Sequence, residues 1–131
     1  MKKTIQSRKD IEILVKNFYD KVINDEMIGF IFNDVAKVNW EAHLPVMYDF
    51  WENVLLQTNK YSGNPMPLHV SLNQKVPLTK AHFDRWLKLF HETIDEYFEG
   101  DTAILAKQRS HSIATIMQIK IAESEKERRF S

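Results

Sequence analysis

Apolar residues recur at helical spacing through three long segments of this chain. In the first segment they follow steps of three and four, so they share one helical face. This stripe comprises Ile11, Leu14, Val15, Phe18 and Val22. Similar stripes lie within positions 40–58 and 83–97. Because no stretch of useful length alternates apolar and polar side chains, the sequence predicts an all-α fold, and its 131 residues predict a single domain, 1–131.

Local signals predict where these helices begin and end. Ser7 followed by Asp10 is typical of a capping box, and the helix after it should end between Asn24 and Gly29. A second helix is expected over 40–58, with Pro45 in or near its first turn, where proline is tolerated. Thr79 should cap a third helix that ends at Gly100.

A fourth helix should start at Asp101 or Thr102 and continue to about Lys126. The residues expected near its inner face are Leu105, Ile113, Ile116, Met117 and Lys120. The first two links between helices are unusual, because each is about ten residues long and carries bulky apolar side chains, whereas helical bundles usually have short connections. A large apolar cofactor is one group that such links could pack against.

Composition excludes several classes of function. Lys+Arg and Asp+Glu both number 18, so no net charge attracts nucleic acid or an acidic membrane. The chain has no cysteine, which excludes disulfides, thiolate metal sites and a cysteine nucleophile. Its three glycines are too far apart for a glycine-rich phosphate loop. With no signal-peptide pattern and no apolar run of membrane-spanning length, a cytoplasmic protein is expected.

The chain has five histidines, and two of them stand out. His43 opens the apolar stripe of the second helix, and His69 follows a proline-rich turn between Leu68 and Val70. His82, His91 and His111 are expected to be ordinary helix residues. No Glu-x-x-His pair of the kind used by di-metal bundles is present, and no serine sits in a nucleophile elbow.

Bulky side chains could form a flat apolar slot beside His43. Met47, Phe50 and Trp51 would build one wall along the second helix, and Phe83 with Trp86 would build a facing wall from the third. A haem site needs such a slot, together with an imidazole for the iron and polar groups on the opposite side.

An ordered set of short motifs resembles the truncated haemoglobins, and within them group III. The motifs are Phe18-Tyr19, Ile28-Gly29 with Ile31-Phe32, Trp40 with His43, Asp49-Phe50-Trp51, 61–65 leading to His69, and Phe83 with 85–90. Together they extend from about Ile11 to Ile121. The glycine pairs usual in groups I and II are absent, in agreement with group III.

The resemblance implies a two-over-two helical sandwich that holds haem b. It implies that His69 is the proximal iron ligand, that Tyr19, His43 and Trp86 lie on the distal side, and that Phe32 packs on the porphyrin. Met47, where the family often has a branched aliphatic residue, is expected to affect ligand access. By position only, Lys60, Tyr61 and Arg85 are candidates to hold the propionates.

The predicted function is binding of dioxygen or another diatomic ligand at a polar distal pocket. Redox turnover of nitric oxide or peroxide is a further possibility, with His43 as acid–base group and electrons from a partner reductase. The chain is expected to be a monomer or a weak dimer, without nucleic acid or membrane partners. Two alternatives stay open: a cofactor-free helical interaction module and a non-haem metal enzyme.

Overall fold

The computed structural model describes the backbone of residues 2–57 and 78–130, and side chains within those ranges up to Lys126. In this part of the chain there are four α-helices and one short π-helix. They are α1 (Arg8–Ile23), η1 (Ile31–Val35), α2 (Trp40–Leu56), α4 (Lys80–Tyr97) and α5 (Asp101–Phe130). The only β-type pairing among these residues is an isolated bridge between Lys3 and Phe98. The all-α prediction is confirmed.

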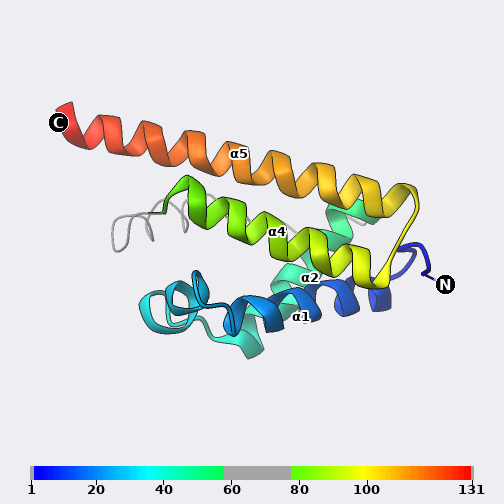
Figure 1. Ribbon diagram of the computed structural model, residues 1–131. Coiled ribbons are helices and arrows are strands. Elements are labelled where there is room, and N and C mark those ends of the chain that lie inside the picture. The colour runs from blue at the N-terminus through cyan, green and yellow to red at the C-terminus, as the bar shows by residue number, and fades with distance from the viewer. Residues whose placement is uncertain (1, 58–77, 131) are drawn as a thin grey trace.

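The helices form two pairs that pack on each other. α4 and α5 run antiparallel side by side, and α1 lies along the other side of α4, with α2 crossing behind (Figure 1). α1 packs on both α2 and α4, so it connects the two pairs. This arrangement is the two-over-two sandwich that the family resemblance implied. None of the described helices combines the length and the apolar character needed to cross a membrane.

Helix α1 begins at Ser7, whose side chain caps it as expected. Its Oγ accepts a hydrogen bond from the Asp10 amide at 3.4 Å. The second half of the predicted capping box is different, because the Asp10 carboxylate accepts from the Gln6 amide at 2.9 Å rather than from Ser7. Asp10 also pairs with Lys3 at 2.6 Å, and this contact ties the N-terminal segment to the first turn of the helix.

Pro45 lies near the first turn of α2, as predicted, but not within it. α2 starts at Trp40, capped by the Asn39 side chain, so Pro45 lies in the second turn rather than the first. Proline there removes the hydrogen bond to the carbonyl of Glu41. Because Pro45 is exposed, water can bind that carbonyl. The helix ends at Leu56, and Gln57 closes it in the left-handed conformation, with φ of 57°.

The link between α1 and α2 is less irregular than predicted, because it contains η1. Ile28 and Ile31 are buried in the core, whereas Phe30 stays 43% exposed. Gly29 packs so closely on the end of α1 that a Cβ would lie 2.8 Å from the Ile23 carbonyl oxygen. A side chain at position 29 would therefore push η1 away from α1.

Helices α4 and α5 begin close to the predicted positions. Thr79 caps α4 and forms a capping box with His82, whose Nδ1 accepts from the Thr79 amide at 3.1 Å. The inner face of α5 was partly mispredicted. Leu105, Ile113 and Met117 do pack inward, but Ile116 is 46% exposed and Lys120 is also exposed.

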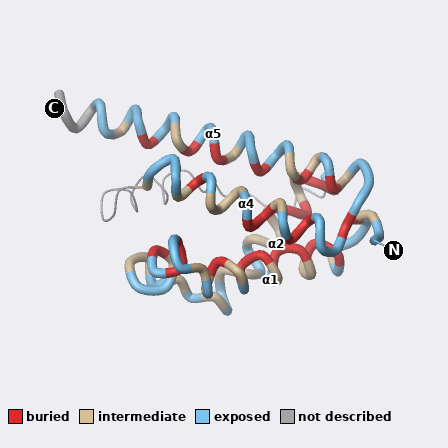
Figure 2. Tube along the Cα trace, viewed as in Figure 1, coloured by how far each residue is buried: buried red, intermediate tan, exposed pale blue. Residues whose placement is uncertain are grey.

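The buried face of α5 consists mainly of small residues instead. They are Ala103, Ala106, Ser110 and Ala114. Small side chains let two helices approach closely, so this face allows α5 to pack tightly against its neighbours. Figure 2 shows the buried positions as a line along the underside of α5, facing α4.

The core is centred on aromatic rings from three helices. Phe90 on α4 is fully buried and stacks on Trp51 of α2, with ring centroids 4.7 Å apart. It meets Phe18 of α1 edge-on at 5.0 Å and lies parallel to Trp86 at 5.8 Å. We call these four rings the Phe90 stack. A buried aromatic ring of this kind typically contributes several kcal/mol, about 3–5 when it is truncated to alanine.

Candidate functional site

Four rings gather beside the core where α1, η1 and α2 meet. Tyr19 of α1 lies at the centre, and its ring centroid is 5.1 Å from that of Trp40, 5.6 Å from His43 and 6.4 Å from Phe32. Trp40 also contacts His43 at 5.7 Å and Phe32 at 6.1 Å. These residues are named the Tyr19 cluster. The structure thus brings together three of the predicted site residues, Tyr19, His43 and Phe32.

The Tyr19 hydroxyl is a buried polar group without a partner in the described part of the chain. The residue is only 6% exposed, and no described group hydrogen-bonds to its hydroxyl. Burial raises the pKa of this phenol well above its usual value, because the phenolate would be poorly solvated. Tyr19 therefore stays protonated and offers an O–H donor. A buried donor left unpaired costs about 1–3 kcal/mol, so such groups usually face a ligand or an ordered water.

Trp86 joins the Tyr19 cluster indirectly. Its ring meets Phe18 edge-on at 5.5 Å, and Phe18 in turn lies 4.9 Å from Tyr19. The Trp86 indole is partly exposed, and no described group accepts its N–H. The side of the core that carries Tyr19 and His43 thus has a second donor one ring further along, on α4.

The predicted apolar walls lie in different parts of the core. Met47 and Phe50 are partly buried against the main core, and Phe50 packs edge-on against Trp51 at 5.4 Å. Trp51 is 2% exposed and belongs to the Phe90 stack. Phe83 packs instead with Ala114, Met117 and Ile121 of α5, in a second cluster that the Trp86 and Leu87 side chains border. Phe83 therefore lies outside the Tyr19 cluster, and Trp86 borders its own cluster.

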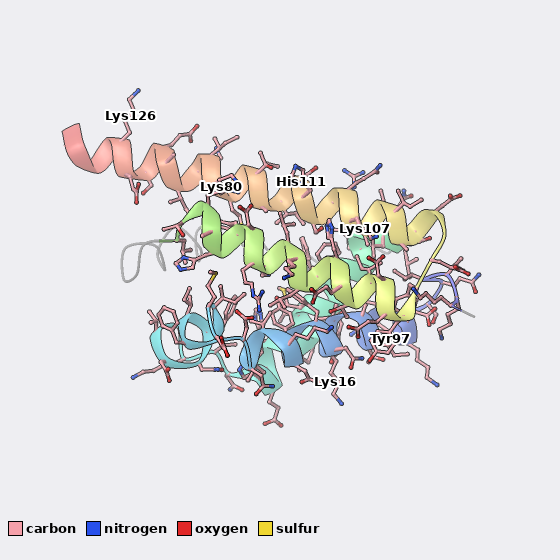
Figure 3. All side chains as sticks on the ribbon, in the orientation of Figure 1. Lys16, Lys80, Tyr97, Lys107, His111 and Lys126 are labelled. Carbon is pink, nitrogen blue, oxygen red and sulfur yellow. The ribbon has the colours of Figure 1, made fainter. Side chains whose placement is uncertain are left out.

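Several candidate residues lie outside the described ranges. They are the predicted iron ligand His69 and the propionate candidates Lys60 and Tyr61. Arg85, the third propionate candidate, is bound elsewhere: its Nε donates to the Asp25 carboxylate at 2.7 Å. The other histidines occupy ordinary positions. His82 caps α4, His91 contacts Ser110 at 3.2 Å, and His111 points outward from α5 (Figure 3).

Sequence reasoning assigned no role to two features at this site. Trp40 was noted only as part of the family pattern, although its position three residues before His43 places both on one helical face. Asp25 was not singled out at all. Its carboxylate accepts from the Met27 and Ile28 amides, both at 3.0 Å, as well as from Arg85, so it ties the corner after α1 to α4. No local pattern in the sequence indicates the long-range contact between Asp25 and Arg85.

The described residues fit one side of a haem pocket. Apolar rings form the walls, an imidazole lies within the Tyr19 cluster, and two donors, the Tyr19 hydroxyl and the Trp86 indole, have no partner among the described residues. Within the described ranges no group of three or more histidine and carboxylate side chains could hold a metal ion. This arrangement agrees with an all-α fold that carries a flat, mainly apolar cofactor.

Comparison with known proteins identifies the family. Residues 3–122 match the model of the bacterial-like globins, and the chain belongs to this family. The group 3 truncated hemoglobin ctb of Campylobacter jejuni is 31% identical over 115 residues, which is 86% of this chain and 88% of that protein. The crystal structure of a group III truncated hemoglobin from Campylobacter jejuni superposes with a TM-score of 0.79 at 29% identity, covering 92% of this chain and 95% of that one.

These matches confirm the resemblance to group III truncated haemoglobins and the truncated-globin fold. Globins in general bind haem and, through it, diatomic ligands such as oxygen, and the family assignment carries that general expectation to this chain.

Proposed function

We propose that this chain binds haem b, with His69 as the proximal iron ligand, and holds dioxygen or another diatomic ligand beside Tyr19, His43 and Trp86. The observation that carries the proposal is the Tyr19 hydroxyl, which is buried, protonated and without a partner in the described part of the chain. Haem iron supplies the atom to which a diatomic ligand binds and the change of oxidation state that chemistry on it requires.

The residues of this chain then determine how long the ligand stays. Tyr19 donates its O–H to a ligand atom that carries partial negative charge, and Trp86 offers its indole N–H from α4. Each hydrogen bond of this kind is worth about 1 kcal/mol, so two or three donors slow dissociation by factors of about ten to several hundred. The apolar rings around them exclude water, which would otherwise compete for the ligand.

Slow release suits reaction with the bound ligand better than transport. We therefore include redox turnover of nitric oxide or peroxide in the proposal, with His43 as the group that moves a proton. His43 and Tyr19 have ring centroids 5.6 Å apart, so an imidazole and a neutral hydroxyl lie on the same side of the pocket. Electrons would come from a partner reductase.

The first test is a visible absorption spectrum of the purified protein in the ferric, reduced and carbon monoxide forms. A Soret band that shifts on reduction and again on carbon monoxide binding is expected. If no Soret band forms even after hemin is added, the haem proposal is wrong, and a cofactor-free helical interaction module becomes the better account. A metal found without porphyrin absorption would instead support a non-haem metal enzyme.

His69→Ala should weaken haem retention and lower the melting temperature.

The second test concerns the distal donors. Tyr19→Phe combined with Trp86→Phe should accelerate oxygen dissociation by about tenfold or more. The matched control is Tyr97→Phe, which removes a hydroxyl that donates to Asn17 on the surface, away from the Tyr19 cluster. If the double variant releases oxygen at the rate of the control, Tyr19 and Trp86 are not the distal donors.

A further inference from the structure

Trp40 touches every other member of the Tyr19 cluster. It is the first residue of α2 and is partly buried, and its ring contacts Tyr19, His43 and Phe32 with centroids 5.1, 5.7 and 6.1 Å apart. Tyr19 lies tilted against the indole at 52°, while the His43 ring stands nearly perpendicular to it at 74°. One indole therefore limits how far both polar rings can rotate.

The Trp40 indole is itself held in place by a polar contact. Its Nε1 donates to the Oδ1 of Asn33 in η1 at 3.4 Å. The amide nitrogen of Asn33 donates in turn to the carbonyl oxygen of Ile23, at the end of α1, at 3.0 Å. These two hydrogen bonds connect the last residue of α1, the middle of η1 and the first residue of α2.

The Tyr19 hydroxyl needs such support because no hydrogen bond within the described residues fixes its direction. Its ring is oriented by packing alone. Phe18 lies on one side, 4.9 Å away, and is itself fixed by Phe90 and Trp86 in the core. Trp40 is the neighbour at a similar distance that is not part of that core stack, so a change at Trp40 can alter the Tyr19 ring without disturbing the centre of the fold.

We propose that Trp40 is a positioning residue for the distal pocket: anchored by Asn33, it sets the orientation of the Tyr19 hydroxyl and the His43 imidazole toward the bound ligand. This inference rests on the proposed function, because it concerns how the chain orients donors toward a ligand on haem. It adds a residue outside the three assigned to the distal side.

The test compares two Trp40 variants with a matched control in the haem-loaded protein. Trp40→Phe keeps a ring against Tyr19 and His43 but removes the N–H that binds Asn33. Trp40→Ala removes the ring as well. Tyr97→Phe is the control, because it deletes an exposed hydrogen bond of the same length, 3.4 Å, between α4 and α1 and outside the Tyr19 cluster. The readouts are the C–O stretching band of the carbon monoxide complex, which reports nearby donors, and the oxygen dissociation rate.

The effects are expected to increase in a fixed order. Trp40→Phe should shift the C–O band and accelerate oxygen release about twofold, and Trp40→Ala should broaden the band into several components and accelerate release about fivefold or more. Tyr97→Phe should match the wild type in both readouts. A merely structural role for Trp40 would lower the melting temperature without moving the band.

The outcomes separate this inference from the proposed function. A wild-type protein that forms no Soret band overturns the proposed function and this inference together. If the wild type binds haem and both Trp40 variants keep its C–O band and dissociation rate, Trp40 does not position the donors, and only this inference is wrong. If Trp40→Ala does not fold, Trp40→Phe decides alone, by whether its band and rate differ from those of Tyr97→Phe.

Discussion

At the scale of single residues, the Tyr19 hydroxyl lowers the stability of the fold. Its hydroxyl is buried next to aromatic rings and has no partner in the described part of the chain, and a buried hydroxyl without a hydrogen bond disfavours the folded state. A phenylalanine would fit the same space without that cost. A tyrosine at this position therefore indicates that the hydroxyl binds a group other than the described residues.

Tyr19→Phe should accordingly leave the protein as stable as before, or more stable by up to about 1 kcal/mol, when no diatomic ligand is present. The same change should accelerate ligand release once a ligand is bound. Urea unfolding of the protein without a diatomic ligand measures the first effect. A loss of more than about 1 kcal/mol would mean that the hydroxyl has a partner within the folded chain and is not reserved for a ligand.

Asp25 has the opposite character, since its side chain is only 2% exposed yet fully paired. Burial tends to raise the pKa of this carboxyl, but the Arg85 guanidinium and the Met27 and Ile28 amides together hold it below its usual value. A carboxyl with a lowered folded-state pKa stabilises the protein above the unfolded-state pKa of about 4, and that contribution is lost as the pH falls through the folded value.

Asp25→Asn should therefore lower the free energy of unfolding at pH 7 by about 1–3 kcal/mol. The difference from the wild type should shrink as the pH falls below about 4, because the wild-type carboxyl is then protonated too. Urea unfolding between pH 3 and pH 7 checks this. Asp84→Asn is the control, since Asp84 pairs with Lys80 at an exposed site and should cost less than about 0.5 kcal/mol. A pH-independent difference would contradict the pairing.

At the scale of elements, the sequence predicted most helices but not their finer structure. Apolar steps of three and four, with Ser7 and Thr79 as caps, are local signals, and α1 and α4 begin where those signals stand. The inner face of α5 was harder to predict, because it is built mainly from alanines and Ser110, which carry little hydrophobic signal. Ile116, a large apolar residue, was expected to be buried but is exposed.

The candidate site was predictable only through the family resemblance. Spacing alone could not show that Tyr19, Phe32 and His43 meet, because they come from three different elements. The contacts of Asn33 with Ile23 and Trp40, and of Arg85 with Asp25, join residues that only the folded chain brings together. No periodicity or cap signal encodes such long-range pairs.

The connection between α4 and α5 depends on Gly100. Its φ of 97° lies in the region that disfavours side chains, and a Cβ there would lie 2.7 Å from the Thr4 methyl carbon. Next to it, the Glu99 amide donates to the Lys3 carbonyl at 3.0 Å, so the N-terminal segment crosses the turn closely. The turn thus restrains both the helix pair and the start of the chain.

Gly100→Ala should destabilise the protein by about 1–3 kcal/mol through backbone strain and the contact with Thr4. Adding Thr4→Ser removes that methyl carbon. The double variant should therefore regain the stability lost through the contact with Thr4, but not the stability lost through the positive φ at position 100. Thermal unfolding of both variants separates the two contributions. Full recovery in the double variant would show that the backbone conformation itself costs nothing.

At the scale of the whole molecule, the contacts that α1 makes with α2 and α4 differ in kind from those between α4 and α5. α1 meets α2 and α4 through aromatic rings, whereas α4 and α5 meet through small residues, the apolar cluster around Phe83 and polar contacts. One polar contact is an exposed ion pair between Lys107 and Asp95 at 2.5 Å. Another joins His91 Nε2 to the Ser110 hydroxyl at 3.2 Å. Ser110 is fully buried. Stability of the α4–α5 pair should therefore depend on whether His91 is neutral.

Burial lowers the pKa of His91 below its usual value of 6.5, and the nearby positive charge of Lys107 adds to this, while Asp95 acts in the opposite direction. The unfolded chain consequently binds a proton at His91 at a higher pH than the folded chain does. The stability of the folded state should fall as the pH drops below about 6.5, and the fall should level off once the folded His91 also becomes protonated.

His91→Gln should remove this step from the pH profile of the free energy of unfolding, because glutamine can still bind Ser110 but does not titrate. His111→Gln is the control: His111 is exposed on the outer face of α5, so the step should remain, although slightly smaller because the charge of His111 also lowers the pKa of His91. Urea unfolding at pH 5, 6, 7 and 8 for the three proteins decides the matter. A step that persists in His91→Gln, or disappears in His111→Gln, would place the proton uptake elsewhere than between α4 and α5.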